Sequence, residues 1–246
     1  MAAITTPPSC CALPAVQSNY TSKGEVIKVG DLDVYVVGPK GSSRAILVNY
    51  DIFGDHPCTR QVCDILSTQG FRVAMPDLCR GDPWPANIWP PPNGFPEVLQ
   101  HIQKHASFPE IQKNMKATQE FLRSEGSSHF GLIGYCWGGY MVALLSQDPV
   151  YEAGAIVHPA AFPLEEAAKV SCPLLILPAR DDAKETFDAI FDVVVKKNPA
   201  SKQRRFDDVH HGFCAARADF SDALNAQRAN EAIEEMSHFF KANIKA

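Results

Sequence analysis

The sequence contains no apolar run long enough to cross a lipid bilayer. Its apolar runs, such as residues 45–48 and 174–177, are far shorter than the roughly 20 residues that a spanning helix needs. A basic excess is missing too, because 23 Lys and Arg stand against 28 Asp and Glu, a net charge of −5. Nucleic-acid-binding proteins usually carry a basic patch or stripe. With 46% hydrophobic residues the chain is folded rather than disordered. We therefore expect a soluble protein that acts on a small molecule, with no nucleic-acid or membrane partner.

A secretory leader and a metal-binding pattern are also missing. The first 14 residues show neither a charged region followed by an apolar stretch nor an Arg-rich amphipathic pattern. The eight cysteines include no two pairs with zinc-finger spacing. There is no GxGxxG after the first strand, no P-loop and no His–Glu metal pair. We therefore expect a cytoplasmic protein with reduced thiols, no metal and no cofactor, in which Cys10 and Cys11 are small buried hydrophobic residues.

Short β-branched runs alternate with longer amphipathic stretches along the chain. Residues 44–50 (RAILVNY), for example, form a largely apolar run of the kind found in buried parallel strands. The alternation predicts an α/β fold, with a mostly parallel central sheet and helices on both faces. We expect one domain, residues 25–246, after an N-terminal segment, residues 1–24. Strands are expected at 26–29, 32–37, 44–50, 71–75, 130–135, 153–157, 173–178 and 203–206, and helices at 58–68, 108–125, 137–146, 183–196 and 223–241.

The segment 83–96 interrupts this pattern with six of the chain's 19 prolines. Such a composition predicts a rigid, irregular loop. Long loops in α/β proteins often cover substrates. Two interpretations therefore stay open, a plain surface loop and a cover over a binding site.

The motif Gly134-Tyr135-Cys136-Trp137-Gly138-Gly139 follows a predicted strand and opens a predicted helix. This is the context of a nucleophile elbow, G-x-Nuc-x-G. A nucleophile on so tight a turn has strained backbone angles, and glycines on either side avoid clashes. The turn lifts the side chain above the sheet, and the helix N-terminus favours an anion such as a thiolate. The motif therefore predicts Cys136 as a nucleophile, and the alternative is a buried cysteine in a glycine-rich turn.

A base and an acid are expected downstream of such a nucleophile, in the order nucleophile, acid, histidine. The predicted strand 173–178 ends in a turn that contains Asp181 and Asp182, where the acid is expected. Further on, His210 and His211 follow a short predicted strand, and one of them is placed to be the base. His158 also follows a strand, but it precedes the expected acid and is the weaker candidate.

The motifs NYDIFG (49–54), MPDL (75–78), GYCWGG (134–139) and HHGF (210–213) together resemble the dienelactone hydrolase family. The resemblance runs from about residue 30 to the C-terminus and implies an α/β-hydrolase fold. It also implies a Cys–His–Asp triad, in which Cys136 is the nucleophile and His211 the base. The acid of the family's G-x-x-D pattern falls on Asp182, with Ala179 in place of the glycine, and Asp181 stays open as a rival.

The resemblance implies further site residues around this triad. The family keeps a carboxylate, usually Glu, before I-F-G, and that position is Asp51 here. Asp51 is expected to activate the thiol or to bind thiol or substrate through water, or else to cap the following helix. Backbone N–H groups of Ile52 and Trp137 are expected to form the oxyanion hole. Arg80 and Arg217 lie near the family's carboxylate-binding arginines and are expected to bind substrate.

The sequence thus predicts a hydrolase that cleaves a small-molecule ester or lactone through an acyl-enzyme, with poor activity on amides. A second hypothesis is a non-catalytic or redox-sensing protein on the same fold that uses Cys136 as a reactive thiol. A third, hydrolysis of glycosidic bonds, needs paired carboxylates across a cleft, and no spacing here favours it. The sequence makes no prediction about the oligomeric state.

Overall fold

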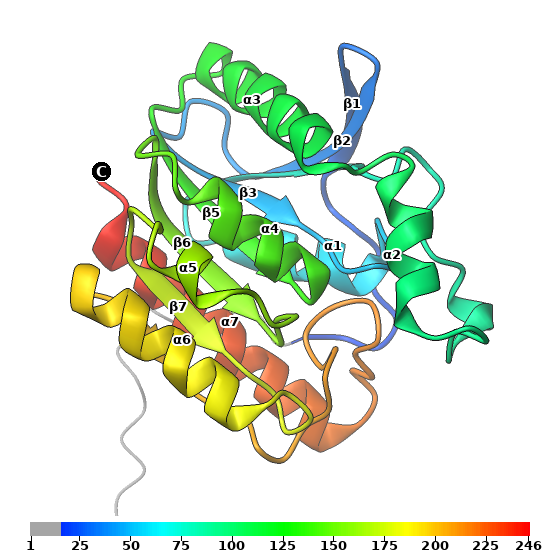
Figure 1. Cartoon of the computed structure of the whole chain (residues 1–246). Coiled ribbons are helices and arrows are strands. Elements are labelled where there is room, and N and C mark those ends of the chain that lie inside the picture. The colour runs from blue at the N-terminus through cyan, green and yellow to red at the C-terminus, as the bar shows by residue number, and fades with distance from the viewer. Residues whose placement is uncertain (1–15) are drawn as a thin grey trace, which may run out of the picture.

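The computed structural model describes residues 16–246 and is built around one eight-stranded sheet (Figure 1). Its strand order is β1-β2-β4-β3-β5-β6-β7-β8. The pairs β1–β2 and β2–β4 are antiparallel, and all other neighbours are parallel. The strands are β1 (Glu25–Val29), β2 (Leu32–Val37), β3 (Arg44–Asn49), β4 (Arg72–Pro76), β5 (His129–Tyr135), β6 (Tyr151–Val157), β7 (Leu174–Leu177) and β8 (Lys202–Gln203).

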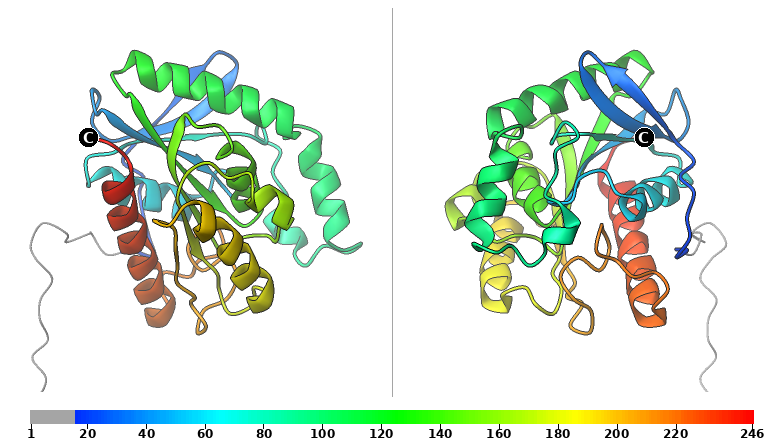
Figure 2. Two further views of the ribbon diagram at one scale, coloured as in Figure 1. Left: turned by 60° about the vertical axis from the view of Figure 1, so that its left-hand side comes forward. Right: turned by 90° about the vertical axis from the view of Figure 1, so that its right-hand side faces the viewer.

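Helices cover both faces of this sheet. On one face, α3 (Phe108–Ser124) and α4 (Trp137–Leu145) pack on the central strands, with α5 (Leu164–Ala167) and α6 (Lys184–Lys197) beside them. On the other face lie α1 (Pro57–Ser67) and the long α7 (Ala223–Asn243). The right-hand view of Figure 2 shows these two layers on opposite sides of the sheet. The predicted mostly parallel α/β sheet is therefore confirmed.

The central strands consist largely of apolar residues because both of their faces are buried. All five residues of β4 and all four residues of β7 are buried, and so are five of the six residues of β3. A strand covered by helices on both faces has no solvent side, so its residues need not alternate between apolar and polar. Every strand and helix that we expect has a counterpart within a few residues, although β8 is only two residues long.

Three short elements are absent from the sequence prediction. They are η2 (Ala86–Ile88), α2 (Phe95–Gln103) and α5. The first two lie in or next to the proline-rich segment 83–96, where prolines mask the helical spacing. In α2 the proline, Pro96, stands in the first turn, where its missing N–H costs no helical hydrogen bond.

The part of the N-terminal segment that the structure describes is attached to two helices. The backbone N–H of Val16 donates to Asn230 on α7, and that of Gln17 donates to Gln61 on α1. The predicted buried positions of Cys10 and Cys11 lie outside the described residues. Among residues 16–246, no helix is both long enough and apolar enough to cross a membrane.

The parallel arrangement decides where a site can form. Strands β3, β5, β6 and β7 run in the same direction, so their carboxyl ends meet at one edge of the sheet. Ligand sites of open α/β sheets lie at this edge. The turns that follow these four strands carry most of the residues predicted from the sequence.

Candidate active site

Cys136 stands on the turn between β5 and α4, in a conformation that is unusual for a residue with a side chain. Its φ is +52° and its ψ −118°, and such strain costs roughly 1–3 kcal/mol. The surrounding glycines are required by close packing. A Cβ on Gly134 would come within 3.0 Å of the carbonyl oxygen of Gly138, and one on Gly138 within 3.0 Å of that of Asn49. The turn therefore holds the thiol at the start of α4.

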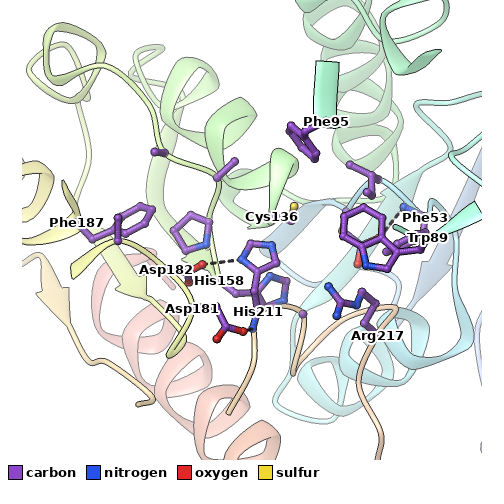
Figure 3. Close-up of a pocket in the computed structure, with 17 residues that line it drawn as sticks. Phe53, Trp89, Phe95, Cys136, His158, Asp181, Asp182, Phe187, His211 and Arg217 are labelled. Carbon is purple, nitrogen blue, oxygen red and sulfur yellow. Dashed lines mark hydrogen bonds and ion pairs between the residues drawn. The ribbon is translucent and has the colours of Figure 1, made fainter. Parts of the chain in front are cut away.

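His211 and Asp182 lie next to each other at the same edge of the sheet (Figure 3). Nδ1 of His211 is 2.6 Å from Oδ1 of Asp182. The second oxygen, Oδ2, accepts a hydrogen bond of 2.7 Å from the backbone N–H of Ala179. Burial lowers the pKa of His211, but the Asp182 hydrogen bond and the neighbouring Cys136 side chain outweigh it and raise that pKa to about 10.

Asp181 has a different partner from Asp182, although the two are adjacent. Its exposed carboxylate accepts a hydrogen bond of 3.1 Å from the backbone N–H of His211 and pairs with Arg180 at 3.1 Å. These two contacts, the backbone N–H first, lower the pKa of Asp181. The side chain of His210 interacts with the carbonyl oxygen of His211 at 2.8 Å. The structure therefore brings Asp182 to the imidazole of His211 and Asp181 to its backbone.

Asp51 lies in the turn after β3 and is buried in the same cavity. Both of its oxygens accept backbone hydrogen bonds, of 2.9 Å from Phe53 and 3.1 Å from Ala216. Burial raises the pKa of Asp51 to about 6, against the opposing effects of these N–H donors and of the positive charges of His211 and Arg217. Asp51 does not cap α1, whose N-cap is His56. It joins the turn after β3 to the chain after His211.

The two N–H groups predicted for the oxyanion hole come from the turn after β3 and from the start of α4. Trp137 is the first residue of α4, and Ile52 lies in the buried turn after β3. Neither N–H donates a hydrogen bond to another residue of the described chain. The carbonyl oxygen of Ile52 accepts from the backbone N–H of Trp84 at 2.9 Å, which ties this turn to the proline-rich segment.

A cavity of about 290 Å³ lies above these residues. Its walls include four aromatic rings, with Phe53 and Trp89 on one side of Cys136, Phe187 on the other and Phe95 above it (Figure 3). Trp89 and Phe95 come from the segment 83–96, so this segment forms part of the wall of the cavity rather than a remote surface. The rings of Phe53 and Trp89 meet edge to face, 5.7 Å apart.

The two arginines predicted for substrate binding have different surroundings. Arg217 lines the cavity, with its guanidinium carbon 5.3 Å from the centre of the Trp89 ring, and makes no ion pair with any residue between 16 and 246. Arg80 lies outside the cavity, contrary to our expectation. Its guanidinium pairs with Asp31, on the turn between β1 and β2, at 2.9 Å.

His158 also lines the cavity, at the carboxyl end of β6. It is fully buried, with a φ of +36°. Burial, and next the positive charge of His211, hold its pKa well below the usual range. Sequence reasoning considered it only as a rival base, because a histidine after a strand gives no indication of which neighbour it will contact.

A metal ion has no evident place in the described chain. No group of three or more His, Cys, Asp or Glu side chains between residues 16 and 246 is arranged to hold one. The carboxylates of Asp51 and Asp182 instead accept hydrogen bonds from N–H groups.

The sheet topology and the cysteine on a strained turn after β5 define a protein with the α/β-hydrolase fold. The sequence model of the dienelactone hydrolase family matches residues 32–244, and the chain belongs to that family. It is accordingly a hydrolase of the ester and lactone type.

Individual relatives agree with this assignment. An uncharacterized AIM2 family protein of Schizosaccharomyces pombe is 30% identical over 249 residues, which cover 95% of this chain and 98% of that protein. A carboxymethylenebutenolidase homolog of Homo sapiens is 29% identical over 169 residues, 66% of each chain. A solved structure from Klebsiella pneumoniae, whose name refers to dienelactone hydrolase, is 18% identical with a TM-score of 0.71, covering 94% of this chain and 99% of its own. This last similarity supports the fold.

Proposed function

We propose that the protein hydrolyses activated esters or lactones of small molecules through a covalent intermediate on Cys136. His211 acts as the base and Asp182 orients it. The observation that carries this proposal is the 2.6 Å contact between Nδ1 of His211 and Oδ1 of Asp182, in the cavity that Cys136 also lines. With Nδ1 engaged, only Nε2 of His211 is free to exchange a proton with the thiol.

The resting enzyme favours a charged pair. A pKa of about 10 keeps the imidazole of His211 protonated near neutral pH, and its positive charge favours an anion on the neighbouring thiol. The positive end of α4, at which Cys136 stands, favours the resulting thiolate. In the proposed mechanism the attacking form of Cys136 is the thiolate.

Two displacements then complete the reaction. The thiolate attacks the carbonyl carbon, and the electron pair of the C=O bond moves to the oxygen, which accepts hydrogen bonds from the N–H groups of Ile52 and Trp137. The intermediate expels the alcohol or enol oxygen, which takes the proton from Nε2 and leaves a thioester on Cys136. Water then gives a proton to His211 and attacks the thioester, which releases the acid and restores the thiol pair. Because a thiolate leaves more easily than an amide nitrogen does, activated esters should react and amides should not.

Asp51 has a supporting part in this proposal. A buried carboxyl with a pKa of about 6 can gain or lose a proton near neutral pH. We assign it to activation of the thiol or to substrate binding through water. Arg217, exposed at the cavity and without an ion-pair partner between residues 16 and 246, is assigned to a carboxylate of the substrate.

Cys136→Ala tests the proposal, with Cys58→Ala as a matched control. Cys58 is a half-buried thiol outside the cavity. We expect Cys136→Ala to lower kcat/KM for p-nitrophenyl acetate by about 10³-fold or more, and Cys58→Ala to leave it unchanged. Retained turnover in Cys136→Ala would contradict the proposal. A wild-type protein that alkylates readily but turns over no ester would favour the thiol-sensor hypothesis instead.

A further inference from the structure

His158 packs in a group of aromatic rings directly beside the proposed base. Its ring centre lies 5.0 Å from that of His211, in an edge-to-face contact with an angle of 62° between the planes. Tyr135 and Phe213 lie on its other sides, with ring centres 5.7 Å and 5.8 Å away. The ring is therefore fixed by neighbours on several sides and contacts His211 with its remaining side.

The two ring nitrogens of His158 are unsatisfied within the described chain. Neither Nδ1 nor Nε2 of His158 has a hydrogen-bond partner among residues 16–246, and both atoms are buried. Buried polar groups are rarely left in this way. Burial and the charge of His211 keep the ring uncharged, so that no second cation competes for the thiolate. His158 thus acts on its surroundings as a neutral aromatic surface.

The contacts of His211 with Asp182 and Asp181 do not fix the orientation of its ring plane, so a further packing surface is required. Asp182 holds Nδ1, and Asp181 holds the backbone N–H. The imidazole can still tilt about the bond between Nδ1 and the carboxylate, and a tilt moves Nε2 away from Cys136. The titratable or charged groups near His211 are Cys136, Asp182, Asp181, His158, His210, Asp51 and Arg217.

We propose that His158 is a positioning residue, whose neutral ring fixes the plane of His211 so that Nε2 faces Cys136. The inference rests on the proposed function, in which His211 serves the thiol. The backbone agrees with a specialised place for His158. Of the three residues other than glycine with positive φ in the described chain, two, Cys136 and His158, line this cavity, and strained residues gather at functional sites.

Two substitutions separate the ring from its nitrogens. His158→Phe keeps a flat, uncharged ring and removes both nitrogens, whereas His158→Leu keeps much of the volume and removes the ring. The matched control is Phe71→Leu, since Phe71 is fully buried and packs edge to face on Phe240, away from the cavity.

Two measurements read out the position of His211. The first is kcat and KM for an activated ester as a function of pH. The second is the rate at which iodoacetamide alkylates Cys136, followed by peptide mass spectrometry between about pH 5 and 9, around and below the pKa of about 8.5 of a free thiol. The alkylation rate needs no turnover, so it tests His158 even if the proposed ester hydrolysis fails.

We expect His158→Leu to lower kcat by about 10- to 100-fold with little change in KM. Alkylation of Cys136 near pH 6 should slow by about tenfold. His158→Phe and Phe71→Leu should match the wild type in both measurements. The proposal is wrong if His158→Leu leaves kcat and the alkylation profile unchanged. It is also wrong if His158→Phe loses as much as His158→Leu, because the nitrogens would then be the active feature.

Discussion

Asp182 and Asp51 are both buried carboxylates that follow parallel strands and line one cavity, yet their oxygens have different partners. One carboxylate oxygen of Asp182 contacts the imidazole of His211, and the other accepts a hydrogen bond from a backbone N–H. Both carboxylate oxygens of Asp51 accept hydrogen bonds from backbone N–H groups, those of Phe53 and Ala216. Both carboxylates are buried, so burial does not distinguish them. Their hydrogen-bond partners do: Asp182 holds the imidazole of His211, whereas Asp51 joins two loops.

The same difference extends to the two sides of the cavity. We call Asp182, after β7, and His211, after β8, the relay side. The turn after β3, the segment 83–96 and Arg217 form the cover side. We expect changes on the relay side to act on kcat, because that side serves the nucleophile. Changes in the segment 83–96 and at Arg217 should act on stability and KM, because these parts of the cover side supply packing, desolvation and charge.

The largest expected effect comes from Asp182→Asn. An amide cannot stabilise the imidazolium of His211 and leaves Nδ1–H without its charged partner, so we expect kcat for an activated ester to fall by about 10³- to 10⁴-fold. Asp181→Asn is the control, since Asp181 accepts from the backbone N–H of His211 and from Arg180 rather than from the imidazole, and it should keep most of the activity. Equal losses in the two variants would remove the distinction between the adjacent carboxylates.

A smaller effect, on stability, should distinguish Asp51. Folding raises its pKa from 3.8 to about 6, so the folded state binds this proton more tightly than the unfolded state does. The stabilisation is complete below about pH 4 and is lost as the pH rises through 6. Relative to Asp51→Asn, the wild type should lose up to about 3 kcal/mol of unfolding free energy across this window.

Urea denaturation of both proteins at several pH values checks this expectation. The measured quantity is the difference in unfolding free energy between wild type and Asp51→Asn, which cancels the titration of all other groups. A difference that stays constant between about pH 4 and 7 would mean that Asp51 titrates normally and that burial does not set the cover side apart.

The smallest effect should come from Arg217→Gln. Because Arg217 is exposed, its contribution to binding a carboxylate is modest, and we expect KM for an ester that carries a carboxylate to rise about tenfold, or about 1.4 kcal/mol. KM for a neutral ester should not change. Arg80→Gln is the control, since its guanidinium pairs with Asp31 outside the cavity. Equal effects of the two substitutions would place substrate binding elsewhere.

Much of this arrangement could be predicted because local sequence determines it. The apolar runs of the buried strands and the glycines around Cys136 reflect constraints within a few residues, and the sheet and the strained turn follow from them. Helix α2 was not predicted because the prolines in and before it interrupt the helical spacing of apolar residues.

Contacts between distant segments could not be predicted in this way. Which of Asp181 and Asp182 meets the imidazole depends on how the turn after β7 is held, through the N–H of Ala179 and the bridge between Ala179 and Phe206. The pairing of Arg80 with Asp31 depends on the turn between β1 and β2. The domain limits, the cytoplasmic location and the absence of a nucleic-acid partner stay predictions.

In the proposed mechanism the acyl group of the substrate passes through Cys136. Rapid acid quenching of the wild-type protein within its first turnover of p-nitrophenyl acetate, followed by peptide mass spectrometry, tests it most directly. We expect a burst of one p-nitrophenolate per active site and one acetyl group on the peptide that contains Cys136. Hydrolysis that proceeds with that peptide unmodified, or with the acetyl group on another residue, would contradict it.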